Sequence, residues 1–245
     1  RVGRAIALEF ARQGFDLVLT YRRSREACEA TAREVVAAAA DAGHGGRAAR
    51  TVELDLADAA SLARATAAID AIVAARAGGA LDALVHNASD YEASPFGALD
   101  AAALERQHRT EVVGPCLLTQ SLAPALARST REGGAAVVLF GDLHSVGRPR
   151  PGYAAYTLAK AGARMLAEQL AVELAPATRV HCVAPSVVML PDGFPEEVRE
   201  RILARTPLGR LGTPEECARL VRFLVCEATF LTGETIRIDG GRGLR

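Results

Sequence analysis

Short apolar runs alternate with longer amphipathic stretches along the whole chain. The apolar runs have the length of strands, and the amphipathic stretches repeat with the period of a helix. We predict strands over residues 16–21, 50–54, 83–86, 135–140, 179–183 and 235–238. We predict helices over residues 3–13, 25–40, 59–75, 101–127, 153–174 and 214–225.

This alternation predicts one class of fold. Strands that are apolar on both faces belong in a parallel sheet that helices cover, and regular strand–helix alternation gives a doubly wound α/β fold. The proline-containing stretch 186–207 is predicted as a loop with a short helix. Because ligands of open α/β sheets lie beyond the carboxyl ends of the strands, we expect this stretch to act as a lid.

The start of the chain departs from this pattern. A doubly wound nucleotide-binding domain begins with a strand and a glycine-rich turn, whereas this sequence opens at Arg1-Val2-Gly3 and continues directly as a helix. We therefore expect a first strand that the sequence does not contain.

Composition narrows the class of protein. The 245 residues suit a single domain, 1–245, and the 29 basic and 29 acidic residues give no net charge. Nucleic acids and anionic membranes attract basic proteins, so neither is an expected partner. No apolar run reaches the roughly 20 residues that span a bilayer. The five cysteines are scattered without metal-ligand spacing, which predicts reduced thiols in a cytoplasmic protein and no metal site.

Tyr156 and Lys160 are the strongest catalytic candidates. Four residues apart in a predicted helix, they share one helical face. An ammonium group beside a phenol lowers the phenol's pKa and makes it a usable general acid. An isolated pair at this spacing is common on ordinary amphipathic helices. Here the pair opens a helix after the Pro/Gly-rich loop 147–152, which follows a buried strand, and this context favours catalysis.

A set of ordered motifs across nearly the whole chain resembles the short-chain dehydrogenases/reductases. The motifs are Arg1-Val2-Gly3, Asp55-Leu56, Asn87-Ala88, Tyr156 with Lys160, Val183-Ala184-Pro185, and Thr232-Gly233 with Asp239-Gly240-Gly241. The resemblance implies a single Rossmann-type parallel sheet flanked by helices, a nicotinamide cofactor and a homotetramer.

The resemblance also implies a set of cofactor contacts. Gly3 would let the backbone approach the cofactor's pyrophosphate at a helix N-terminus, where the helix dipole favours anions. Arg1 stands where the family usually has glycine, and its cation suits a phosphate or a polar ligand. The remaining expected contacts are Asp55, Leu56, Asn87, Ala88, Lys160 and Pro185.

The residues after the second family strand predict the choice of cofactor. NAD-dependent enzymes typically place an acidic residue there to bind the ribose hydroxyls. This chain has Tyr21-Arg22-Arg23-Ser24 instead, followed by Arg25. Guanidinium and hydroxyl groups suit a 2′-phosphate, so we expect NADPH.

Several details resemble the pteridine reductase and dihydromonapterin reductase branch. These are Arg1-Val2-Gly3, Tyr21-Arg22-Arg23-Ser24, Asn87-Ala88-Ser89-Asp90-Tyr91, Gly141-Asp142, Ala184-Pro185-Ser186 and the ending from Asp239. By this resemblance Asp142 and Tyr156 supply the proton, and Arg1, Ser89 and Tyr91 line the pterin site. The ring of Tyr91 could stack on the pterin.

Some residues depart from the family pattern. Asp142 lies one residue farther from Tyr156 than the family spacing, which implies an insertion, and Ser145 is a rival for its role. Glu111 stands where the family has asparagine, and a carboxylate there could accept from Lys160. Asp90 adds a negative group of unknown effect, and His144 is expected to be a surface histidine.

Three functions remain open at this point. The first is NADPH-dependent reduction of a dihydropterin or dihydrofolate. The second is reduction of a carbonyl or 3-oxoacyl substrate within the same superfamily. The third is a non-catalytic nucleotide-binding subunit, suggested by the expected missing strand and by Glu111.

Overall fold

The computed structural model describes residues 1–191 and 193–244. Its helices are α1 (Val2–Arg12), α2 (Arg25–Asp41), α3 (Ala59–Ala74), α4 (Ala101–His108), α5 (Gly114–Leu126), α6 (Ala154–Glu173), α7 (Glu196–Ala204) and α8 (Pro214–Cys226). Its strands are β1 (Leu17–Tyr21), β2 (Ala49–Glu53), β3 (Ala83–His86), β4 (Ala135–Phe140), β5 (Thr178–Pro185) and β6 (Thr235–Ile238). The six predicted strands are confirmed, with ends that shift by at most two residues.

All strand pairs of the described chain are parallel, but they form two hydrogen-bonded groups. β1 pairs with β2, and β3, β4, β5 and β6 follow one another in a second sheet. Side chains join the two groups. Leu17 of β1 and Val85 of β3 pack against one apolar cluster, while Val18 and Leu84 pack against another on the opposite face. The two groups therefore share the same core.

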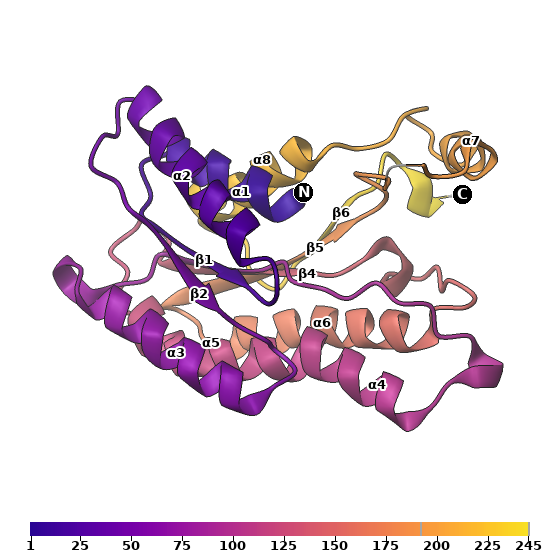
Figure 1. Ribbon diagram of the computed structural model, residues 1–245, viewed down its shortest axis with the longest axis horizontal. Coiled ribbons are helices and arrows are strands. Elements are labelled where there is room, and N and C mark those ends of the chain that lie inside the picture. Colours follow the sequence, from indigo (N-terminus) through magenta and orange to yellow (C-terminus); the bar gives the residue numbers. More distant parts are fainter. Residues whose placement is uncertain (192, 245) are drawn as a thin grey trace.

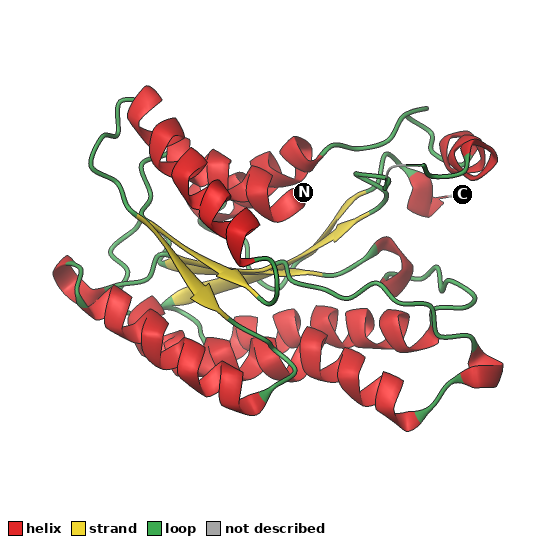
Figure 2. Cartoon of the chain, in the orientation of Figure 1, coloured by secondary structure: helices red, strands yellow, loops and turns green. Residues whose placement is uncertain are grey.

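Helices cover both faces of the strands, as predicted. α1, α2 and α8 lie on one face, and α3, α4, α5 and α6 lie on the other (Figures 1 and 2). None of the described helices is both long and apolar enough to cross a membrane. The chain therefore has the three-layer arrangement of a Rossmann-type domain.

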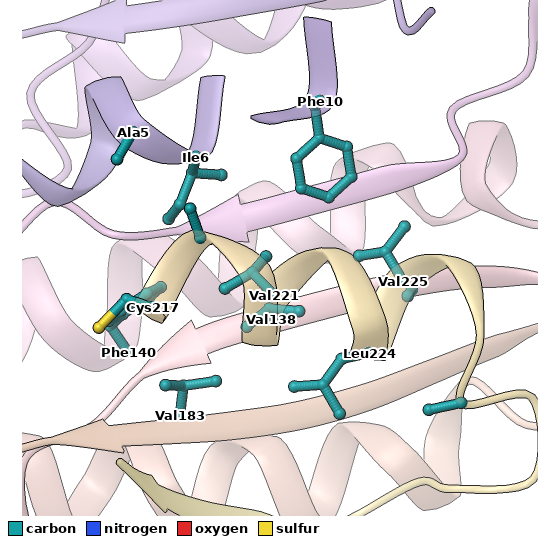
Figure 3. Packing of buried hydrophobic residues seen from close by; sticks show 13 residues of the cluster. Ala5, Ile6, Phe10, Val138, Phe140, Val183, Cys217, Val221, Leu224 and Val225 are labelled. Carbon is teal, nitrogen blue, oxygen red and sulfur yellow. The ribbon is translucent and has the colours of Figure 1, made fainter. Parts of the chain in front are cut away.

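β4 is the centre of this core. All six of its residues are buried, and successive side chains point to opposite faces of the sheet. Val138 and Phe140 meet Ile6 and Phe10 of α1 and Val221 of α8 (Figure 3). The alternate residues Val137 and Leu139 pack in the cluster that α6 covers. β4 consequently reads as a continuous apolar run rather than an alternating one.

The predicted helix 101–127 is wrong in one respect, because it is interrupted. α4 ends at His108, a π-helical turn covers Arg109–Val113, and α5 follows. Pro115 has no N–H group, so it cannot donate the helical bond that Glu111 would otherwise accept. The turn leaves Glu111 buried in the interior.

The stretch 186–207 contains α7, as the sequence predicted. α7 lies near the C-terminal end of the chain, on the side of the molecule where β5 and β6 end (Figure 1). Whether this stretch closes over a ligand stays a prediction.

Two histidines are buried without charge compensation. His181 lies in β5 and is fully buried, and neither of its ring nitrogens has a hydrogen-bond partner among the described residues. His86 ends β3, and its Nε2 lies 2.8 Å from the hydroxyl oxygen of Thr119. Burial lowers the pKa of each imidazole from 6.5 to about 4. Both side chains are therefore neutral in the folded chain at neutral pH.

We expect the stability of the fold to decrease in mild acid. Between pH 6.5 and 4 the unfolded chain binds protons that the folded chain excludes, so each histidine removes roughly 1.4 kcal/mol of unfolding free energy per pH unit in that window. Above pH 6.5 the two states bind protons equally and the effect vanishes. Urea denaturation from pH 7.5 to 5 measures this slope. His181→Leu should reduce the slope, whereas His108→Gln at an exposed position should leave it unchanged; an equal slope in all three proteins would contradict the prediction.

Candidate active site

The carboxyl ends of the parallel strands bring several predicted residues to one edge of the sheet. Asn87 follows β3, Asp142 lies two residues beyond β4, and Pro185 ends β5. Each of these strands is hydrogen-bonded to its neighbour in parallel register. Residues from distant parts of the sequence therefore meet in one region, as open α/β sheets require of a ligand site.

Asp142 and Tyr156 are in direct contact. The hydroxyl of Tyr156 donates to Oδ2 of Asp142 at 3.0 Å. The other carboxylate oxygen of Asp142 accepts from the backbone N–H of His144 at 2.7 Å, which fixes the carboxylate's orientation. Tyr156 lies in the first turn of α6 and is only 6% exposed. The structure thus joins the two residues that the sequence assigned to proton transfer.

Lys160 lies one turn further along α6 and is almost completely buried. Its ammonium donates to the carbonyl oxygen of Phe140 at 2.7 Å and forms an ion pair with Glu111 at 2.9 Å. The hydroxyl of Ser89 donates to the second oxygen of Glu111 at 2.5 Å. The carboxylate at position 111 therefore accepts from the ammonium and compensates its charge.

The pKa of Tyr156 departs from the prediction. Lys160 was expected to lower the pKa of Tyr156, but that pKa is raised. Burial of the phenol is the main cause, and the negative charge of Asp142 with its hydrogen bond is the next. Glu111 adds negative charge beside the positive charge of Lys160, so the ammonium does not lower the pKa of Tyr156 as predicted. Tyr156 is therefore held in the protonated form at neutral pH.

Tyr91 takes part in an aromatic cluster over Tyr156. Its ring stacks on Tyr153, with centroids 4.6 Å apart, and meets the ring of Tyr156 edge-on at 4.9 Å. The guanidinium carbon of Arg150 lies 4.5 Å from the centroid of Tyr153. The face of Tyr91 that stacks on Tyr153 is thus not available to a substrate in this conformation, although half of the side chain is exposed.

Ser94 positions this cluster. Its hydroxyl accepts from the backbone N–H of Ala155 at 3.0 Å, and its own N–H donates to the carbonyl of Gly152 at 2.7 Å. These bonds tie the segment after β3 to the first turn of α6. The sequence analysis missed Ser94, Tyr153 and Arg150. Only Tyr153 carried a signal, because it precedes Tyr156 by three residues and so lies on the same side of the helix start.

The N-terminus of α1 fits a dinucleotide phosphate. The first amide groups of α1 have no side-chain cap, and such amides bind anions. A Cβ atom on Gly3 would lie only 3.0 Å from the side-chain nitrogen of Asn87, so glycine allows these two predicted contacts to lie close together. Arg1 is exposed at the N-cap position.

One arginine of the basic turn after β1 is already paired with a carboxylate. Both terminal nitrogens of Arg22 donate to the carboxylate of Asp90, at 2.5 and 2.8 Å. This pair raises the pKa of Arg22 and links the turn to the segment after β3. Arg23 and Ser24 are exposed beside it, and the hydroxyl of Ser24 makes no cap bond to α2. Asp90, whose effect the sequence left open, thus holds one of the predicted phosphate-binding arginines.

The other expected contacts have structural roles of their own. One oxygen of Asp55 accepts from the backbone N–H of Ala57 at 2.9 Å, as a strand-end cap does. Leu56 is buried in the core beside α3. Tyr21 ends β1, and Ala88 is exposed beside Asn87. These positions leave the cofactor contacts of the four residues as predictions.

Ser145 does not face Tyr156 as a free donor. Its hydroxyl donates to the carbonyl of Asp142 at 2.7 Å, within a one-turn cap after β4. Nδ1 of His144 lies 2.7 Å from the carbonyl oxygen of Arg148, so this partly exposed ring is tied to its own loop. Asp142 is therefore the group of this loop that contacts the phenol.

Two surface hollows lie away from these residues. One, of about 480 Å³, is lined by β2 and α3, including Glu53 and Arg64. The other, of about 330 Å³, lies between α4 and α6 and includes His108 and Leu158. Neither is lined by Tyr156 or Asp142.

Comparison with known proteins identifies the family. A family model described as Enoyl-(Acyl carrier protein) reductase matches residues 2–242. The 3-oxoacyl-[acyl-carrier-protein] reductase FabG of Staphylococcus aureus is 30% identical over 244 residues, which cover 98% of this chain and 93% of that protein. The uncharacterized oxidoreductase YohF of Escherichia coli is 32% identical over 246 residues, covering 98% and 90%.

Solved structures agree with this result. The acetoin dehydrogenase from Enterobacter cloacae has a TM-score of 0.83 at 30% identity and covers 99% of this chain and 91% of its own. A short-chain type dehydrogenase/reductase from Mycobacterium ulcerans has a TM-score of 0.86 at 25% identity, covering 100% and 86%. The matches confirm the superfamily but give no specific support to the pteridine reductase branch. The chain belongs to the short-chain dehydrogenases/reductases and is an oxidoreductase of that superfamily.

Proposed function

We propose that this protein is an NADPH-dependent reductase of pterins, which converts a dihydropterin or dihydrofolate to its tetrahydro form. The observation that carries this proposal is the hydrogen bond from the Tyr156 hydroxyl to the Asp142 carboxylate. A carboxyl group beside the catalytic phenol suits a heterocycle that is rich in N–H donors and takes up a proton on a ring nitrogen. A neutral hydroxyl at this place would suit a carbonyl oxygen.

The paired groups can deliver one proton without leaving a charge on the phenol. When bound, NADPH would supply the hydride to the carbon of the substrate's C=N bond. Tyr156 would donate its proton to the ring nitrogen, and one proton from solvent would return to the phenol by way of Asp142, whose Oδ2 accepts from the hydroxyl in the resting site. Lys160, anchored by Phe140 and Glu111, lies beside this pair and would hold the cofactor's ribose.

Reduction of a carbonyl or 3-oxoacyl substrate is the second candidate. The relatives favour it over pterin reduction, because their names concern 3-oxoacyl-acyl carrier protein and acetoin. The observation against it is the engagement of Ser145 with the backbone of Asp142, which leaves a carboxylate rather than a hydroxyl beside Tyr156. The third reading, a non-catalytic subunit, is disfavoured by the close contacts among Asp142, Tyr156, Lys160 and Glu111.

The basic turn after β1 supports NADPH as the cofactor. Arg23 and the hydroxyl of Ser24 are exposed there, and Arg22 lies beside them in its pair with Asp90. A 2′-phosphate would recruit these groups, since guanidinium groups bind phosphate through charge-assisted hydrogen bonds. The homotetramer and the cytoplasmic location that the sequence analysis expects stay predictions.

A substrate comparison with Asp142 variants tests the main proposal. With NADPH, the protein should reduce dihydrobiopterin and dihydrofolate faster than acetoin or a 3-oxoacyl thioester. Asp142→Asn should lower kcat/KM for pterins by roughly 100- to 10,000-fold, the usual contribution of a general acid. The measurement is the loss of NADPH absorbance, with Tyr156→Phe as the inactive control. Turnover of carbonyl substrates alone, with Asp142→Asn as active as the parent protein, would establish the second candidate instead.

Release of Arg22 tests the cofactor assignment. Asp90→Asn removes the charge that holds Arg22, so the Kd for NADPH should fall by up to about tenfold while the Kd for NADH changes little. Arg23→Gln should raise the Kd for NADPH selectively. The fluorescence of the bound nicotinamide measures both constants, and Arg33→Gln, which removes an exposed arginine of α2, is the matched control. Tighter binding of NADH than of NADPH by the parent protein would contradict the assignment.

A further inference from the structure

Four arginines gather around the loop that carries Asp142. Nη1 of Arg148 donates to the carbonyl oxygen of Arg242 at 3.2 Å, and Nη1 of Arg242 donates to the hydroxyl of Ser186 at 3.2 Å. Burial lowers the pKa of Arg242, and the positive charges of Arg150, Arg205 and Arg148 lower it further. Three segments of the chain therefore bring like charges within electrostatic reach of one another.

Negative charge does not balance this cluster among residues 1–191 and 193–244. Asp142 acts on Arg242 with negative charge and is also engaged by Tyr156, while the carboxylate of Asp239 accepts from the backbone N–H groups of Gly241 and Gly243. None of the four arginines forms an ion pair within those ranges, although the chain as a whole has no net charge. Like charges held together raise the local positive potential and attract an anion.

Arg150 is the member of the cluster nearest the aromatic groups at Tyr156. Its guanidinium carbon lies 4.5 Å from the centroid of Tyr153 and 5.6 Å from that of Tyr91. Tyr91 in turn meets Tyr156 edge-on at 4.9 Å. The aromatic faces hold the guanidinium by cation–π attraction, which leaves its N–H groups able to donate at their edges.

We infer that Arg150, supported by Arg148, Arg205 and Arg242, binds an anionic group on the substrate, a carboxylate or a phosphate, while the substrate's reducible ring or carbonyl lies at Tyr156. This inference rests on the proposed reductase site at Tyr156, but it holds for either substrate class. It predicts that a pterin with carboxylates, such as dihydrofolate, is preferred over the neutral dihydrobiopterin. For carbonyl substrates it predicts acetoacetate over its neutral ethyl ester.

The test compares these two matched pairs in the full-length protein with saturating NADPH. In the parent protein the KM for the anionic member should be at least about tenfold below that for the neutral member, the effect of one charge-assisted hydrogen bond. Arg150→Gln should abolish this ratio and Arg150→Lys should retain part of it. Arg33→Gln, which removes an exposed arginine of α2, should retain all of it. Acetate and inorganic phosphate as competitive inhibitors distinguish the two anion types.

Three results would overturn the inference. The parent protein could show no preference for charge, Arg150→Gln could raise the KM of both members equally, or it could raise the KM for NADPH instead. Isothermal titration with folate and biopterin separates this failure from failure of the proposed function. If neither substrate pair is reduced, the proposed function fails. The anion site is then still supported if folate binds more tightly than biopterin and Arg150→Gln removes this difference. It is refuted if the two ligands bind equally.

Discussion

The carboxyl end of β4 is the point on which the candidate site depends. Phe140, the last residue of β4, accepts from Lys160 through its carbonyl oxygen, and two residues later Asp142 accepts from Tyr156. Both partners lie on one face of α6, so a single helix is attached to a single strand end at two places. Because β4 is buried on both faces, its position is set by packing from α1, α8 and α6. The geometry of the two catalytic candidates therefore follows from a fully buried strand of the core.

A buried ammonium needs a partner, and the nature of that partner changes the chemistry. An amide at position 111 would leave the charge of Lys160 uncompensated and free to stabilise a phenolate. The carboxylate of Glu111 instead compensates it, and isolated charges in a protein interior are too costly to leave unpaired. The π-helical turn places Glu111 toward the interior, where it also accepts from Ser89. Together with burial of the phenol and the charge of Asp142, this pairing leaves a Tyr156 that stays protonated and is a weaker acid than an ordinary phenol.

Much of the fold was predictable because it depends on local pattern. The apolar run of β4 and the four-residue spacing of Tyr156 and Lys160 need only the geometry of strands and helices. The interruption at Arg109–Val113 was not predicted, although Pro115 carries its physical cause. The contacts of Arg22 with Asp90 and of Ser94 with α6 join residues about 60 or more positions apart. The paths of loops decide such contacts, and hydrophobic periodicity says little about loops. The predicted direction of the shift in the Tyr156 pKa was wrong for the same reason. The shift depends on Asp142, Glu111 and Lys160, which only the folded chain brings together.

The relatives indicate the fold and the reaction class, whereas the side chains around Tyr156 bear on the choice of substrate. Family membership supports the fold and the oxidoreductase class, and the roles of Tyr156 and Lys160 stay predictions. Substrate choice lies in what surrounds that pair, and there this chain has a carboxylate at Asp142, a tyrosine stack and several arginines. A carboxylate alone beside the phenol would repel an anionic substrate. The proposed anion site would offset this repulsion, because Arg150 lies over Tyr153 and Tyr91, and Tyr91 contacts Tyr156. Charge at this site is thus divided in space, with a negative group where the proton is transferred and positive groups where the rest of the substrate would lie. Such a division suits a molecule whose ring donates hydrogen bonds and whose tail carries negative charge.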